Sequence, residues 1–174
     1  MTDSDYDTWV ICRHKFAATG RSAVITVNST LEKRLNFAEY PYHVSIAIDA
    51  AAHAVDASGR IGAHESQHLL ALSRVIRESL ESEDQHLIAI VHGDGARTLE
   101  VHARDGGAVA RRLNALKADK TWDRPWGFEV KSDPAGQLSK AWRDIAATSQ
   151  EHHLAINISH SHGGAGADHH HYLF

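Results

Sequence analysis

The sequence predicts a mixed α+β domain, because two kinds of apolar periodicity alternate along one chain. Between residues 42 and 49 apolar side chains occupy every second position, which is typical of a strand with one buried face. Between residues 63 and 83 they recur at intervals of three and four, as in an amphipathic helix. From residue 41 onward the expected order is strand, helix, strand, strand, helix, strand. This order is typical of a ferredoxin-like split β-α-β sandwich.

Two further strands precede this unit and are expected to form an added N-terminal β-hairpin. Residues 8–16 and 22–28 are rich in β-branched and aromatic residues. Gly20 lies in the short connection between them, where a turn requires a positive φ. The hairpin is therefore an addition to the ferredoxin-like unit.

The second half of the unit repeats the alternation of strands and helices. The apolar run 86–92 ends at Gly93-Asp94-Gly95, and residues 98–104 then alternate, so these segments are expected to form a hairpin. A helix over 108–118, a strand over 126–130 and a third helix around Trp142 are expected to follow. Beyond residue 149 only the alternation of Leu154, Ile156 and Ile158 indicates structure, as an edge strand.

The expected topology makes the strands over 42–49 and 98–104 central neighbours, with both helices on one face. Apolar residues of these strands then point at the helices. The polar residues share the opposite face, which we expect to be open: His43, Ser45, Asp49, Glu100, His102 and Arg104. Two imidazoles and a carboxylate would suit metal binding or acid–base chemistry there. A solvated face and a surface that binds a partner are the alternatives.

The composition indicates one globular domain over residues 1–149, followed by a His/Gly-rich C-terminal extension over 150–174. The chain has 174 residues, of which 43% are hydrophobic and 23% charged. Cys12 is the single cysteine, so no internal disulfide can form. The acidic start of the chain is unlike a secretory signal, and no apolar stretch is long enough to span a membrane. We therefore expect a cytoplasmic protein without a membrane partner.

The net charge of −4 argues against a nucleic-acid partner. No aromatic residue on the polar face of the strand over 98–104 could stack on a base. Sequence-specific binding of nucleic acid is therefore not expected, and the partner would be a protein or a small molecule.

Histidine is unusually abundant, with 15 residues in the chain and seven of them after residue 150. The run His64-Glu65-Ser66-Gln67-His68 has the spacing of a zinc hydrolase, in which two histidines one helical turn apart bind Zn and the glutamate acts as general base. His86 could supply a third ligand. The run precedes the apolar stripe that begins at Leu69, which favours a solvated first turn without a catalytic role.

The extension carries a second group of histidines that could bind Zn, Ni or Cu: His160, His162, His169, His170 and His171. Its glycines would let the backbone wrap around an ion. Loose histidine clusters also bind divalent metals without a biological role, so both interpretations stay open. No cofactor is required by the sequence.

The chain also resembles a known bacterial family. The run Tyr40-Pro41-Tyr42-His43-Val44 at a strand start, preceded by a hairpin that opens at Trp9, is similar to the family of domain of unknown function 695. The segment 128–134 and the helix around Trp142 resemble the end of the same domain, so the resemblance covers about residues 8–146. The family implies no catalytic role for any residue.

These observations favour a non-catalytic binding or regulatory module, with divalent-metal affinity through its histidine clusters as a further expectation. The alternative is a zinc-dependent hydrolase that uses His64, Glu65 and His68.

Overall fold

A computed structural model describes residues 7–148 and 154–157 of the chain. The strands are β1 (Thr8–Lys15), β2 (Ser22–Asn28), β3 (Tyr42–Asp49), β4 (Gln85–Gly93), β5 (Ala96–Ala103), β6 (Trp126–Ser132) and β7 (Leu154–Asn157). The helices are α1 (Ser29–Arg34), α2 (Ala63–Ser79), α3 (Gly106–Asp119) and α4 (Gln137–Thr148), with a short 3-10 helix at Ala52–Ala54. The predicted hairpin, central strands and three longer helices are all present.

All the described strands join one antiparallel sheet in the order β6-β3-β5-β4-β2-β1-β7. As predicted, β3 and β5 are central neighbours, and Val44 lies opposite Val101 in their register. The N-terminal hairpin extends the same sheet, because β2 pairs with β4. The edge strand predicted after residue 149 is present as β7, which pairs with β1.

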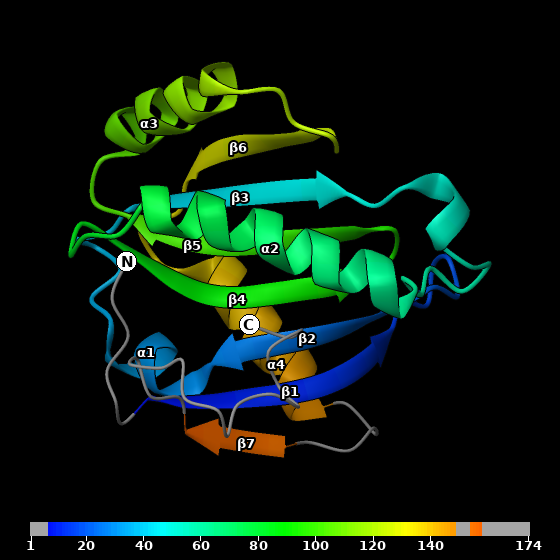
Figure 1. The fold of residues 1–174 in the computed structure, drawn as a ribbon. Helices are drawn as coiled ribbons and strands as arrows, with labels where there is room; N and C mark the ends of the chain where they lie inside the picture. The colour runs from blue at the N-terminus through cyan, green and yellow to red at the C-terminus, as the bar shows by residue number, and fades with distance from the viewer. Residues whose placement is uncertain (1–6, 149–153, 158–174) are drawn as a thin grey trace.

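The sheet separates two layers of helices (Figure 1). We call the side covered by α2 and α3 the first face and the side covered by α4 the second face. The core on the first face contains buried side chains from β3, β5, α2 and α3, among them Val44, Ile46, Leu69, Ile76, Leu99, Val101, Val109 and Leu113. The core on the second face contains Cys12, Ile25, Val27 and Ala146, with Trp142 packed against them.

Strand β4 contributes to both cores through a bulge. The register with β5 shifts between Leu87 and Ala89. Leu87 and Ile90 therefore lie in the core of the first face, whereas Ala89 and Val91 lie in that of the second. Burial on both faces explains why this segment is a continuous apolar run in the sequence.

The predicted open face is covered at three of its polar residues, and for these the expectation was wrong, whereas Asp49 and Arg104 are exposed. Its residues His43, Glu100 and His102 do share the second face, as predicted, but they are 5%, 4% and 0% exposed. The segment between α1 and β3 accounts for part of the cover, because the ring of Phe37 packs edge-on against His102, with 4.7 Å between the ring centroids. This loop, which the periodicity did not reveal, thus covers part of the second face beside α4.

Candidate functional site

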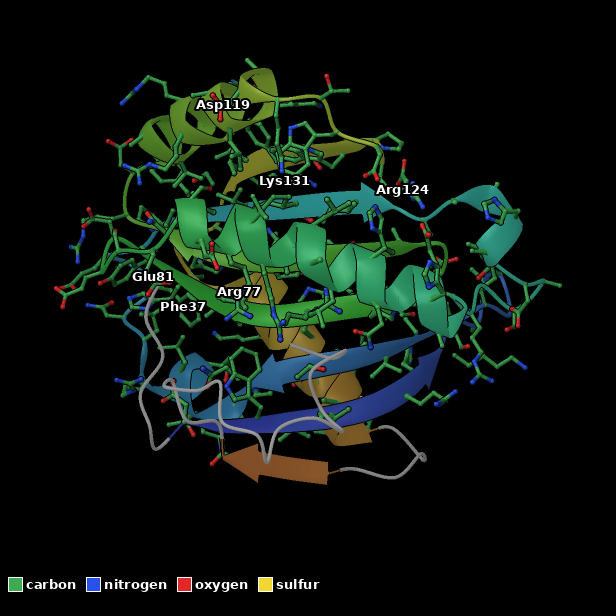
Figure 2. The ribbon with its side chains drawn as sticks, viewed as in Figure 1. Phe37, Arg77, Glu81, Asp119, Arg124 and Lys131 are labelled. Atoms are coloured by element: carbon green, nitrogen blue, oxygen red, sulfur yellow. The ribbon has the colours of Figure 1, made fainter. Side chains whose placement is uncertain are left out.

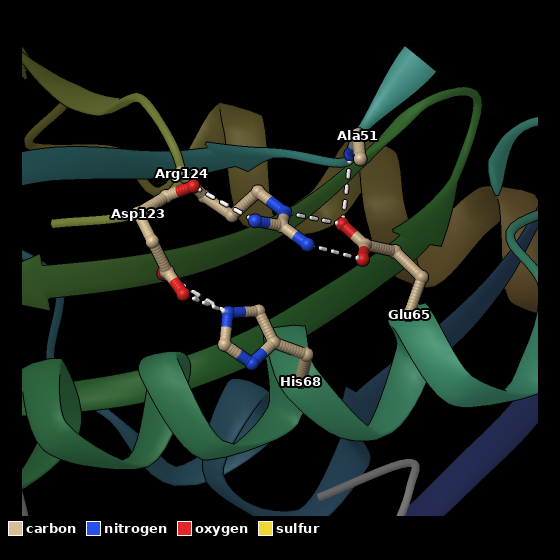
Figure 3. A network of polar contacts seen from close by, with 5 residues as sticks. All are labelled: Ala51, Glu65, His68, Asp123 and Arg124. Atoms are coloured by element: carbon tan, nitrogen blue, oxygen red, sulfur yellow. Dashed lines mark hydrogen bonds and ion pairs between the residues drawn. The ribbon is translucent and has the colours of Figure 1, made fainter. Parts of the chain in front are cut away.

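The histidine–glutamate motif lies in the first turns of α2, where the sequence places it, but it is not a free catalytic group. Glu65 is 4% exposed, although the sequence favoured a solvated turn. Its two carboxylate oxygens accept hydrogen bonds of 2.7 Å from Nε and Nη2 of Arg124, and Oε2 accepts another from the backbone N–H of Ala51 (Figure 3). Glu65 therefore ties α2 to the segments that follow β3 and precede β6.

These contacts fix the charge of Glu65. The hydrogen bonds from Arg124 lower the pKa of Glu65 from 4.5 to about 2, against the opposing effect of burial. A carboxylate with this pKa is a very weak base near neutral pH, whereas a general base works best with a pKa near the working pH. This arrangement does not suit Glu65 to activate a water molecule.

The histidines of the motif and His86 make separate contacts and do not converge on one site. Nε2 of His68 contacts the carboxylate of Asp123 at 2.9 Å, and this hydrogen bond lowers the pKa of Asp123 (Figure 3). His64 is exposed, and the ring of His86 packs edge-on against Tyr40. Among residues 7–148, no group of three or more His, Cys, Asp or Glu side chains could hold a metal ion. The geometry thus does not bring His64, His68 and His86 together as a ligand set.

A second polar cluster lies under the loop that covers the second face. Nε2 of His43 is 2.8 Å from Oε2 of Glu100, and Oε1 of Glu100 accepts a hydrogen bond from the hydroxyl of Ser45. The ring of His102 lies beside that of His43, at 5.4 Å between centroids. The sequence correctly predicted that these side chains would lie together, but their burial leaves no open surface for a ligand.

Burial favours the neutral form of His102. The carbonyl of Tyr40 can only accept, so Nδ1 of His102 carries the proton and donates across 2.9 Å. Burial lowers the pKa of His102, an effect that outweighs the contacts with Tyr40 and Asp133. Asp133 in turn accepts the backbone N–H groups of Gln137 and Leu138 at the start of α4. This cluster therefore connects the sheet to the covering segments.

Arg104, which the sequence placed on the same face, lies at the border of this cluster. It follows β5 directly, is exposed, and donates from Nη2 to the hydroxyl of Tyr40 at 2.8 Å. Its guanidinium also lies over the ring of Tyr40, 4.6 Å from the centroid. Arg104 thus supports Tyr40, whose hydroxyl donates to the carbonyl of Glu83.

A third polar cluster, which the sequence analysis missed, lies on the first face beneath α2. Arg97 of β5 is 0% exposed and donates from Nε to the hydroxyl of Ser73 at 3.0 Å. Its Nη1 lies 3.3 Å from Nδ1 of His92, and Nε2 of His92 lies 2.9 Å from the hydroxyl of Ser66. Side chains from α2, β4 and β5 thus meet around one buried guanidinium.

The Ser66–His92 contact looks like a nucleophile beside its base, but the neighbouring arginine excludes that chemistry. A guanidinium only donates, so Nδ1 of His92 must accept from Arg97. In neutral imidazole the proton is then on Nε2, which donates to Ser66 and cannot take its proton. Burial, reinforced by Arg97, lowers the pKa of His92 to about 4, so the imidazole is neutral near pH 7.

Positive charge is concentrated around Arg97. Burial, together with the charges of Arg77 and Arg74 on α2, lowers the pKa of Arg97 to about 9. Arg77 is half-buried and lies over β4 beside α2, whereas Arg74 is exposed (Figure 2). We call Arg74, Arg77 and Arg97 the arginine cluster. Arg97 occupies the same alternating positions of β5 as Leu99 and Val101, so its side chain lies on the same buried face of the strand. This alternation was the sequence signal for its burial.

The histidines of the C-terminal extension, from His160 to His171, lie outside the described residues. Their metal affinity stays a prediction. No helix among residues 7–148 has the length and apolar character needed to cross a membrane.

Comparison with known proteins identifies a family but no activity. No curated protein and no solved structure matches the chain. The model of a family of unknown function, DUF695, matches residues 7–139, which include β1 to β6, all three polar clusters and the start of α4. Because this match covers most of its length, the chain belongs to the DUF695 family.

Proposed function

We propose that this protein is a non-catalytic binding module and that the arginine cluster binds an oxyanion, such as the phosphate or carboxylate group of a small molecule or protein partner. The observation that carries the proposal is the fully buried guanidinium of Arg97, which Ser73 and His92 orient beneath α2, the helix that carries Arg74 and Arg77. Guanidinium groups bind such anions through paired, directional N–H donors.

The arrangement of Arg97 supports a binding role. Ser73 and His92 each engage a different nitrogen of its guanidinium, which limits rotation of the group. Burial strengthens the field of a charge because the surrounding dielectric is low. Arg77 and Arg74 would provide the accessible contacts to the anion, while Arg97 would supply a fixed positive charge beneath them.

The chemistry of the other two clusters favours binding over catalysis. Glu65, the only glutamate of the zinc-hydrolase motif, is held as an ion-pair partner of Arg124. His43, Glu100 and His102 are buried beneath a loop. The proposed binding function therefore requires no cofactor, and divalent-metal affinity of the histidines in the C-terminal extension stays a separate proposal. We further propose that residues 42–132 form a ferredoxin-like unit and that the protein acts in the cytoplasm. The strand order β6-β3-β5-β4 supports the first of these.

A phosphate titration of the full chain tests the binding site. Inorganic phosphate should raise the melting temperature relative to chloride at equal ionic strength, because a ligand that binds only the folded state stabilises it. The variant Arg74→Gln/Arg77→Gln should lose most of this increase. Arg111→Gln, which removes an exposed arginine from α3, should retain it and serves as the matched control.

Two outcomes would contradict the proposed function. One is a melting temperature that does not depend on phosphate. The other is an increase in melting temperature that is the same in the wild-type chain and in the Arg74→Gln/Arg77→Gln variant. This result would show that phosphate binds at another part of the molecule.

A further inference from the structure

Among the strands of residues 7–148 and 154–157, β6 forms one edge of the sheet, and its side away from β3 has a defined hydrogen-bonding pattern (Figure 1). The N–H of Asp49 donates to the carbonyl of Pro125, and the N–H of Asp133 donates to the carbonyl of Pro41. Odd-numbered residues of this segment therefore direct their backbone groups toward β3. In an antiparallel ladder the alternate residues direct theirs away. The outward groups of β6 belong to its even-numbered residues, which include Phe128, Val130 and Ser132.

A contact at the start of the strand agrees with this phase. Nζ of Lys117, on α3, donates to the carbonyl of Trp126 at 2.5 Å. Trp126 is even-numbered, so its carbonyl belongs to the outward set. The lysine occupies the edge at Trp126, and the stretch available for pairing with another strand begins at Phe128.

The side chains along this stretch are self-complementary in charge. Glu129 and Lys131 are 66% and 56% exposed, and they alternate with the half-buried Phe128 and Val130. Within one chain, Nζ of Lys131 lies 3.7 Å from Oε1 of Glu129, an exposed ion pair that solvent screens. If a second copy pairs antiparallel about a two-fold axis at Val130, that residue meets itself, and Phe128 meets Ser132 of the partner subunit. Glu129 then lies directly opposite Lys131 of the partner subunit, and the symmetry repeats this contact.

The backbone phase permits this register. Val130 directs its N–H and C=O outward, so the self-pair at the axis is a hydrogen-bonded pair. Glu129 and the partner's Lys131 then form a non-hydrogen-bonded pair, in which side chains approach more closely. Opposite charges placed directly across two strands stabilise their pairing, whereas like charges destabilise it. A register centred on Glu129 or on Lys131 would instead oppose like charges.

We propose that β6 is an interaction surface for a second copy of this chain, which joins the two sheets edge to edge through residues 128–132. The interface is isologous, as expected for a two-fold dimer. The inference goes beyond the oxyanion-binding function and does not depend on it, because the arginine cluster lies over β4 and β5.

A charge-swap series on the full chain tests this surface. Sedimentation equilibrium should detect a reversible dimer of the wild-type chain. Glu129→Lys places like charges opposite each other twice, so the dissociation constant should rise about tenfold. Lys131→Glu should act in the same way. The double variant Glu129→Lys/Lys131→Glu restores opposite charges and should return the dissociation constant to near the wild-type value.

The series separates pairing from loss of fold, because both side chains are exposed and each variant can be checked by its far-UV circular dichroism and melting temperature. A chain that is monomeric at all accessible concentrations would overturn the proposal. A dimer whose dissociation constant is unchanged by the single variants, or is not restored by the double variant, would also overturn it.

Discussion

Replacing Glu65 by glutamine tests how much the ion pair between α2 and the segment before β6 stabilises the fold. Glutamine keeps the shape of the side chain and removes its charge. The pKa of Glu65 is about 2 instead of 4.5, a difference worth roughly 3 kcal/mol as an upper limit. Because the side chain of Arg124 is 22% exposed, solvent screens part of this interaction. We therefore expect Glu65→Gln to lower the free energy of unfolding by about 2 kcal/mol at pH 7.

The pH dependence of this loss has a definite sign. An unfolded chain binds a proton at Glu65 near pH 4.5, whereas the folded chain binds it near pH 2. The stabilisation is therefore complete above pH 4.5 and is lost as the pH falls toward 2. The difference in unfolding free energy between the wild-type chain and Glu65→Gln should be largest at neutral pH and should shrink across that window.

Urea denaturation followed by circular dichroism measures these differences. Arg124→Met provides the second variant of a double-mutant cycle, and in its background Glu65→Gln should have a much smaller effect. Glu78→Gln, an exposed glutamate on the same helix, should change stability by less than about 0.5 kcal/mol. The assigned role of the pair would be refuted if Glu65→Gln lowered the free energy of unfolding no more than Glu78→Gln does. It would also be refuted if the effect of Glu65→Gln were unchanged in the Arg124→Met background.

Two further predictions follow from burial. Ile76→Ala should lower the free energy of unfolding, measured by urea denaturation, by about 2 to 5 kcal/mol, because the Ile76 side chain is fully buried. Leu72→Ala should lower it less, because Leu72 is only partly buried. Equal losses in the two variants would contradict the orientation of α2. His92 binds a proton near pH 6.5 when unfolded and about pH 4 when folded, so its contribution is complete above pH 6.5 and is lost as the pH falls toward 4. His92→Gln should flatten the pH dependence of unfolding free energy over this range, by roughly 3 kcal/mol, and an unchanged slope would show that the imidazole titrates normally.

The arrangement of β3 and β5 could be predicted because it depends on local pattern. Alternation of apolar and polar residues determines which side chains share a face, whatever lies above that face. The same alternation correctly grouped His43, Glu100 and His102. It could not predict their burial, since Phe37 and Tyr40 reach them from a loop with no periodicity.

Helix α1 was missed for a related reason. Its six residues are too few to display a helical apolar stripe, and the helix is stabilised by local capping, in which the side chain of Asn28 accepts a hydrogen bond from the N–H of Leu31.

A motif can also be matched correctly and still be misleading. The sequence places His64, Glu65 and His68 on a helix, and the helix is there, but the charge of Glu65 is set by Arg124, 59 positions away.

The sequence by itself determined the α+β class, the order of the strands and the three longer helices, and the two faces of each central strand, because these follow from periodicities of two and about 3.6 within short segments. The tertiary structure alone decided which polar groups are paired, buried or grouped by charge. Ionisation and hydrogen bonding depend on neighbours a few ångströms away, and those neighbours come from distant positions in the chain. For this reason the sequence indicated the histidines as candidate site residues, whereas the structure indicates Arg97 and the arginines of α2.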